Sequence, residues 1–249
     1  MNYAIYLTIL NLTLLARLRL IFRDKGVTDK DLIIIGALPL LVLPFVQFSW
    51  AWGLLAIHLV SYPFVMRAAE RNKEKLNRNR ALTFLYHLLI TGIICSSLLN
   101  ISGGLLVEKG ISFFGWMFLP GQNIYLDIDM VNTIQIILAG ILLVINEMNI
   151  VLRYILNVMG LQSIGEQEDK VSDEEYSMGR LIGLLERIFI FIFVLLNQYS
   201  AIGFILAAKG VTRFNNFKDD RSFAEYVLIG TLLSTLLALI VGWGVRILI

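Results

Sequence analysis

Residues 134–153 read IQIILAGILLVINEMNIVLR, and this stretch decides how the rest of the chain is interpreted. Its first twelve residues are apolar apart from Gln135 and carry no charge. An apolar run of this kind, without the alternation of a half-buried strand, predicts a membrane helix. The same run continues through two asparagines, a glutamate and an arginine. These polar residues need an explanation, because lipid favours apolar side chains.

The composition of the whole chain agrees with a membrane protein. The 249 residues are 57% hydrophobic and 16% charged, whereas soluble domains have roughly 45–50% apolar and about 25% charged residues. The excess lies in blocks rich in Leu, Ile and Phe that match the roughly 20 residues of a membrane-crossing helix. We therefore expect an all-α, polytopic transmembrane helical bundle with about seven to eight membrane segments.

Eight apolar segments are placed at residues 2–22, 32–48, 52–66, 81–101, 131–159, 179–198, 200–217 and 223–249. Residues 1–160 form an N-terminal block, in which residues 102–130 are read as an interfacial or re-entrant piece. Residues 161–178 form an acidic linker, and residues 179–249 form a three-helix membrane block. Two alternatives stay open for residues 188–208, which form either one crossing or a hairpin that turns at NQYS.

The distribution of basic residues predicts the orientation of the segments. Residues 17–30 and 67–80 are rich in Arg and Lys, and the second stretch has six basic residues against two acidic ones. Basic loops favour the cytoplasmic side of a membrane. The predicted topology therefore has the N-terminus outside and the linker 161–178 in the cytoplasm of a bacterial plasma membrane.

Most of the polar residues of the fifth segment lie on one helical face, whose positions follow at steps of three or four: Asn132, Gln135, Ala139, Leu142, Asn146, Asn149, Arg153 and Asn157. Glu147 lies beside this stripe. Ionisable groups at mid-depth cost several kcal/mol in lipid, so the stripe is expected to face other helices or a wet cavity. The amides either form hydrogen bonds between helices or belong to a binding site. The Arg153 side chain either extends to the cytoplasmic surface of the membrane or reaches that site.

Charged residues of the C-terminal block form a second candidate group: Arg180, Glu186, Arg187, Lys209, Arg213 and Glu225. In the hairpin arrangement they approach one another near the cytoplasmic boundary. They form either an ion-pair network that fixes helix packing or a site for an anionic group, such as a lipid phosphate or a charged metabolite.

No motif indicates a cofactor, a metal or a catalytic centre. His58 and His87 lie on different predicted helices and are each interpreted as packed, hydrogen-bonded side chains, because two such histidines without a carboxylate cluster do not make a metal site. The sequence contains no P-loop, Gly-rich dinucleotide turn or GxSxG elbow. The net charge of +2 gives no indication of nucleic-acid binding.

The C-terminal block contains the runs GRLIGLLER, AIGFILAAK and FAEYVLIGT, in this order. The block resembles the end of a bacterial inner-membrane family known only as a domain of unknown function. The resemblance covers about 55 residues and rests on Gly179, Arg180, Glu186, Arg187, Lys209, Arg213, Arg221, Glu225 and Tyr226. The N-terminal half is similar only loosely, because Tyr62 stands near where family members have an Asp after the first His. The resemblance implies a bacterial plasma membrane protein and supplies no activity.

Three functions are therefore considered. The first is an integral membrane protein, with membrane lipids around it, that binds or transports a small polar or anionic solute or a lipid headgroup through an intramembrane polar site. The second is a non-catalytic assembly or signalling subunit, in which the linker and the basic loop recruit a cytosolic protein partner. The third is a membrane enzyme acting on a lipid phosphate, which needs a histidine or glutamate at a cleft on the cytoplasmic side.

Overall fold

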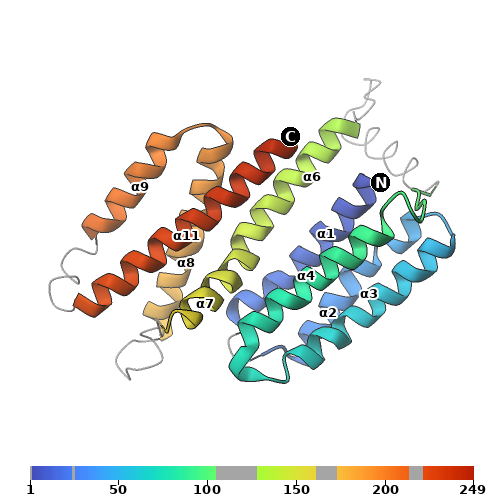
Figure 1. The fold of residues 1–249 in the computed structure, drawn as a ribbon, viewed down its shortest axis with the longest axis horizontal. Helices are drawn as coiled ribbons and strands as arrows, with labels where there is room; N and C mark the ends of the chain where they lie inside the picture. Colours follow the sequence, from blue (N-terminus) through green and yellow to red (C-terminus); the bar gives the residue numbers. More distant parts are fainter. Residues whose placement is uncertain (1, 24–25, 105–127, 161–172, 213–220) are drawn as a thin grey trace. The chain divides into compact units, whose positions relative to one another are not determined.

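The computed structural model describes residues 2–23, 26–104, 128–160, 173–212 and 221–249 (Figure 1). These residues form helices joined by turns, and the one backbone bridge among them connects Val46 and Gly103. The all-α prediction is confirmed. The chain divides into two compact units, Met1–Leu142 and Leu143–Ile249, and each is described by itself. The predicted re-entrant piece falls mostly on residues 105–127, outside the described residues.

Four helices in the described part of the chain are long and apolar enough to cross a membrane. They are Tyr3–Ile21, Trp50–Ala69, Asp129–Val158 and Glu225–Leu248. The structure therefore agrees with a membrane protein that has transmembrane helices. It does not support the predicted count of seven to eight segments.

Several of the predicted apolar segments form short or partly polar helices, which is why the described residues do not support that count. Helix α2, Asp29–Leu40, has 12 residues, since Pro39 lies in its last turn and the chain continues as the 3₁₀ helix η2, Leu43–Phe45. At about 1.5 Å per residue, α2 is about 18 Å long, against about 30 Å of hydrocarbon. Helix α9, Tyr199–Thr212, has only 14 residues. Helix α4, Leu76–Ile94, begins with the polar run NRNR.

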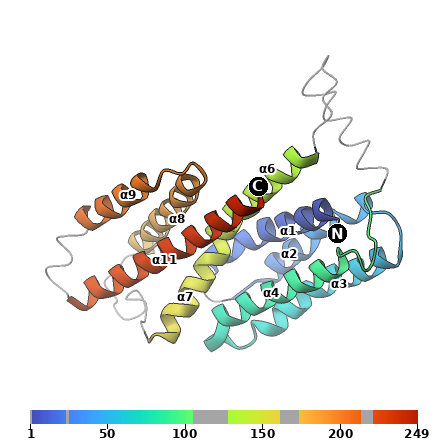
Figure 2. The same cartoon turned by 45° about the horizontal axis from the view of Figure 1, so that its top comes forward.

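The first unit contains helices that run between the same two ends of a bundle (Figure 2). Helix α1, Tyr3–Arg17, is extended by the 3₁₀ turn η1, Leu18–Phe22, and packs against α2, α4 and α6, Ile128–Leu142. Helix α3, Trp50–Ala69, packs against α2 and α4. At one end lies the apolar core, with side chains from α1, η2 and its flanks, α3, the last residue of α4 and the region after it: Ile5, Ile9, Val42, Val46, Ala51, Leu55, Leu59, Ile94, Cys95 and Ile101.

Helix α2 begins with a capping box, in which Thr28 and Asp31 satisfy each other's backbone N–H groups. Asp31 is fully buried, and burial by itself raises the pKa of its carboxyl. Hydrogen bonds from the Thr28 side chain and backbone and from Arg19, together with the charge of Arg23, outweigh burial and lower the pKa to about 2. The helix start is therefore fixed by an ionised carboxylate.

The predicted fifth segment is one long helical run that contains a π-helical turn. Helix α6 passes into the π turn η4, Leu143–Glu147, and then into α7, Met148–Val158. A π turn inserts about one extra residue and rotates everything that follows it. The 3.6-residue period assumed for the polar stripe therefore does not hold through this turn. Asn132 and Gln135 belong to the first unit, and Asn146 and the polar residues after it belong to the second.

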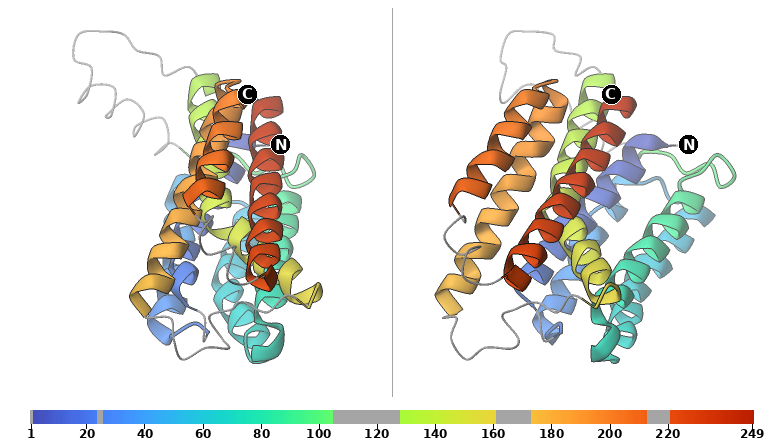
Figure 3. Two further views of the ribbon diagram at one scale, coloured as in Figure 1. Left: turned by 90° about the vertical axis from the view of Figure 1, so that its left-hand side faces the viewer. Right: turned by 60° about the vertical axis from the view of Figure 1, so that its left-hand side comes forward.

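The second unit contains α7, α8, α9 and α11. Helix α8, Asp173–Leu195, packs against α9 and against α11, Arg221–Leu248 (Figure 3). The turn between α8 and α9 has Asn197 at φ 59°, in the left-handed region that Asn tolerates better than most residues. Of the two alternatives for residues 188–208, the structure has the hairpin and not one continuous helix. Helix α8 starts at Asp173, within the predicted linker, because acidic residues are favourable in a first helical turn.

Candidate functional site

The interior of the first unit holds a chain of buried polar side chains from three helices. The Thr13 hydroxyl of α1 lies 2.9 Å from Nε2 of His87 on α4, and Nδ1 of His87 lies 3.1 Å from Nε2 of His58 on α3. All three side chains are buried, and the two imidazole rings stack with their centroids 5.1 Å apart. The prediction of packed, hydrogen-bonded histidines is confirmed. The sequence did not indicate that they bond to each other.

Arg17 continues this polar interior one helical turn after Thr13. Its side chain is fully buried and donates hydrogen bonds to the Tyr62 hydroxyl at 2.8 Å and to the Arg80 carbonyl at 3.2 Å. Its guanidinium also lies over the Phe84 ring, 5.0 Å from the centroid. The sequence placed Arg17 among the basic anchors of a loop. It is instead an interior residue that joins α1 to α3 and α4.

A buried ion pair closes one end of the first unit. Nε of Arg80 donates to Oε1 of Glu70 at 2.6 Å, and both side chains are at most 5% exposed. The other carboxylate oxygen of Glu70 accepts from the Val27 N–H at 2.7 Å. Glu70 therefore ties the turn between α3 and α4 to the turn between α1 and α2. The two basic stretches 17–30 and 67–80 meet at the same end of this unit.

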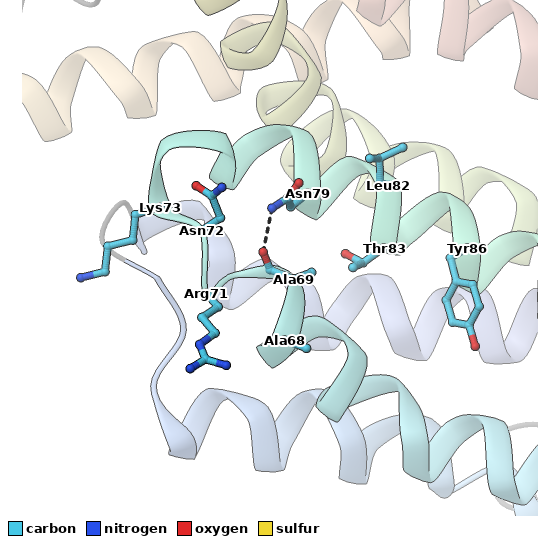
Figure 4. Close-up of a pocket in the computed structure, with 9 residues that line it drawn as sticks. All are labelled: Ala68, Ala69, Arg71, Asn72, Lys73, Asn79, Leu82, Thr83 and Tyr86. Carbon is cyan, nitrogen blue, oxygen red and sulfur yellow. Dashed lines mark hydrogen bonds between the residues drawn. The ribbon is translucent and has the colours of Figure 1, made fainter.

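An open cleft of about 840 Å³ lies at this end, between the last turn of α3 and the first turns of α4 (Figure 4). Its walls combine two cations, two amides and a small apolar surface: Ala68, Ala69, Arg71, Asn72, Lys73, Asn79, Leu82, Thr83 and Tyr86. Asn79 Nδ2 donates to the Ala69 carbonyl at 2.7 Å, which holds one wall against the other. Tyr86 also contacts the His58 ring, so the cleft lies beside the buried polar chain.

The basic side chains around this cleft fall into two groups. Arg67 is paired with Asp29 at 3.1 Å, and Arg80 is buried against Glu70. The other four are exposed and take part in no ion pair or hydrogen bond among the described residues: Arg71, Lys73, Lys75 and Arg78. Only the first two of these four line the cleft. The cleft is therefore a positively charged recess with neutral hydrogen-bonding groups in its wall.

The predicted polar core of the second unit is tightly packed. Asn146 and Glu147 are at most 2% exposed, and Nδ2 of Asn146 donates to Oε1 of Glu147 at 2.8 Å. Both residues lie in the π turn, and neither lines the cleft between α3 and α4. Asn149, one position beyond the first residue of α7, is half-buried.

The structure brings some of the predicted C-terminal charges together. Arg187 on α8 is buried, lies close enough to Arg153 of α7 for their charges to interact, and contacts the Ser234 hydroxyl of α11 at 3.5 Å. Lys209 and Glu186 form an ion pair across the α8–α9 hairpin. Arg180 is half-buried on α8, and Glu225 is exposed near the start of α11. Arg213 lies outside the described residues.

The sequence analysis did not predict the buried polar network of the first unit, although pairs of polar residues four positions apart could have indicated it. Thr13 and Arg17, His58 and Tyr62, and Thr83 and His87 each lie one turn apart on their helices. Each pair therefore forms a short polar face on an apolar helix. Three such faces on neighbouring helices would have indicated a shared interface.

Comparison of the chain with known protein families, with curated proteins and with solved structures finds no match.

Proposed function

We propose that the protein is a multi-pass membrane protein that binds an anionic group, namely the phosphate of a lipid headgroup or of a small solute, in the cleft between α3 and α4. The observation that carries this proposal is the exposed pair Arg71 and Lys73 in a recess whose wall also offers amide and hydroxyl groups. Guanidinium and ammonium groups make the strongest hydrogen bonds to phosphate oxygens. The Asn72, Asn79 and Thr83 side chains supply neutral hydrogen-bonding groups around it.

The surroundings of the cleft favour a phospholipid over a free anion. The cleft lies at the end of Trp50–Ala69, one of the four helices that could cross a membrane. Leu82 and Tyr86 line it, and the next turn of α4 carries the exposed Leu85 and Leu89. An acyl chain can follow this apolar surface while the headgroup phosphate contacts the basic residues. Basic recesses between membrane helices on the cytoplasmic side are suited to anionic headgroups.

The proposed orientation places this cleft on the cytoplasmic face of a bacterial plasma membrane. Both basic stretches lie at the same end of the first unit, where Val27 bonds to Glu70 and Asp29 pairs with Arg67. The positive-inside rule assigns such an end to the cytoplasm. Asn2 lies at the other end, where its N–H bonds to the Cys95 carbonyl. The N-terminus is then outside, and we propose that the linker 161–178 is cytoplasmic.

The proposal is confined to binding and does not include transport. The residues predicted as an intramembrane site, Asn146 and Glu147, are packed, and Lys209 is paired with Glu186. A third function, catalysis on the bound phosphate, lacks support from the histidines. His58 and His87 do not line the cleft and bond to each other instead.

The test compares two double variants that remove the same charge. Arg71→Gln with Lys73→Gln removes the two cleft-lining cations, whereas Lys75→Gln with Arg78→Gln removes two exposed cations outside the cleft. Binding of a fluorescent short-chain phosphatidylglycerol, and of inorganic phosphate, is measured on purified full-length protein in a zwitterionic detergent. Each contact of a basic residue with an anionic lipid contributes about 1 kcal/mol. The cleft variant is therefore expected to weaken lipid binding roughly thirtyfold.

The control variant is expected to change lipid binding by no more than about threefold. Loss of phosphate binding in parallel with lipid binding in the cleft variant identifies the phosphate as the recognised group. A wild type that binds phosphate but not the lipid, and loses phosphate binding in the cleft variant, identifies a soluble anion. Equal losses in the two double variants would contradict a built site. They would favour the alternative function, a basic surface that recruits a cytosolic partner, because Lys75 and Arg78 are exposed outside the cleft.

A further inference from the structure

Helices α1 and α6 meet through polar side chains near the end of the first unit that lies away from the basic turns. Thr8 and Asn11 are three residues apart on α1, and Asn132 and Gln135 are three residues apart on α6. Nδ2 of Asn11 donates to the Gln135 carbonyl at 3.0 Å, and Nε2 of Gln135 donates to the Thr8 hydroxyl at 3.2 Å. The first half of the predicted polar stripe therefore faces α1.

The hydrogen bonds fix which atom of each amide points where. The Gln135 carbonyl can only accept, so the Asn11 amide must present its NH₂ group there. The Thr8 hydroxyl donates to the Ala4 carbonyl at 2.8 Å, so it must accept from Gln135. Oδ1 of Asn11 and Oε1 of Gln135 are consequently buried without a hydrogen-bond partner among the described residues, and so is Oδ1 of Asn132. Asn11 itself is 7% exposed.

Three buried acceptor oxygens at one helix contact require an explanation. A buried polar atom without a partner costs about 1–3 kcal/mol, and most such atoms in native proteins are satisfied. A second cleft, of about 400 Å³, reaches Asn132 from this end of the unit. Its polar lining consists of uncharged side chains: Asn2, Tyr3, Ser96, Ser97, Asn100 and Asn132. The cleft therefore provides a route from the surface to Asn132, which lies one helical turn before Gln135 on α6.

We propose that these oxygens bind a monovalent cation, such as Na⁺, that enters through the second cleft. The three groups are acceptors, so the ligand must bring positive charge or donors. Divalent cations prefer carboxylate ligands, whereas neutral carbonyl oxygens bind Na⁺ and K⁺ in membrane proteins. The site is independent of the phosphate cleft, because it uses α1 and α6 and lies at the opposite end of the first unit.

The test measures equilibrium binding of ²²Na⁺ to the purified full-length protein in detergent. Saturable binding is expected for the wild type. Asn11→Leu and Gln135→Leu each remove one oxygen ligand and are expected to weaken binding about tenfold. Asn157→Leu is the matched control, because Asn157 is an exposed amide on α7, and it is expected to leave the affinity unchanged.

Gln135→Glu keeps the test decisive if the leucine variants fail to fold. This nearly isosteric change adds a negative charge to the ligand set and is expected to tighten Na⁺ binding about tenfold or more. Unlabelled K⁺ is expected to compete with ²²Na⁺, whereas the bulky cation N-methylglucamine is not. The proposal is overturned if the wild type shows no saturable binding, if Gln135→Glu leaves the affinity unchanged, or if N-methylglucamine displaces Na⁺ as well as K⁺ does.

Discussion

The buried pair of Glu70 and Arg80 gives the sharpest prediction about how the cleft between α3 and α4 is held. Glu70→Gln keeps the size of the side chain but leaves only one acceptor oxygen. In the wild type, the two carboxylate oxygens accept from Arg80 Nε at 2.6 Å and from the Val27 N–H at 2.7 Å. The amide NH₂ of a glutamine must then face one of these two donors. The substitution therefore loses a charge-assisted hydrogen bond and creates a donor–donor contact.

The expected loss of stability follows from the burial of the pair. The Arg80 and Glu70 side chains are 2% and 5% exposed, and Nη2 of Arg80 has no partner among the described residues. Removing one partner of such a pair leaves a buried charge uncompensated, at a cost of about 3–5 kcal/mol. For a chain of this length, such a loss lowers the unfolding temperature by roughly 10 °C. Thermal unfolding in mild detergent, followed by circular dichroism, measures this shift.

The exposed pair of Arg67 and Asp29 supplies a matched control in the same turns. Its side chains are 65% and 77% exposed, so Asp29→Asn is expected to cost less than about 1 kcal/mol. Combining Glu70→Gln with Arg80→Met removes the stranded charge and is expected to recover part of the loss. The reasoning is refuted if Glu70→Gln is as mild as Asp29→Asn, or if the double variant is less stable than Glu70→Gln alone.

Three further predictions concern other parts of the fold. The pKa of Asp31 falls from 3.8 to about 2 on folding, so the stabilisation by its carboxylate is present above pH 4 and is lost as pH drops through 2. Asp31→Asn is therefore expected to lower the free energy of unfolding by about 2 kcal/mol at pH 7. The stabilities of the two proteins, measured during acid titration, should converge near pH 2. A Cβ at Gly242 would lie 2.9 Å from Val194, so Gly242→Ala is expected to destabilise the α8–α11 contact by about 1–3 kcal/mol. Gly244→Ala is the control, because a Cβ there would have nothing within 4 Å, and thermal unfolding should show it to be neutral or stabilising. His87→Leu strands two buried hydrogen-bond partners and is expected to cost about 2–4 kcal/mol; a loss below about 1 kcal/mol in chemical unfolding would contradict the network.

The sequence was most informative about features that depend on neighbouring residues. Composition and run length predicted an all-helical chain with helices that could cross a membrane, and the described residues contain four such helices. The polar turn around Asn197 indicated the hairpin of α8 and α9. Helix formation depends mainly on residues within one or two turns, so these features can be read from periodicity and turn residues. Run length failed where Pro39 shortened α2, because an apolar stretch and an unbroken helix are different properties.

The candidate site was decided by contacts between helices. The pairing of His58 with His87, the burial of Arg17 and the tie from Glu70 to Arg80 depend on how each helix is rotated against its neighbours. The π turn before Met148 shows the same limit, since it changes that rotation without a clear mark in the sequence. The sequence by itself determined the helices, their apolar character and the positions of basic charge. Only the tertiary structure decided which polar side chains meet, because helical periodicity specifies a face and not the partner on which it packs.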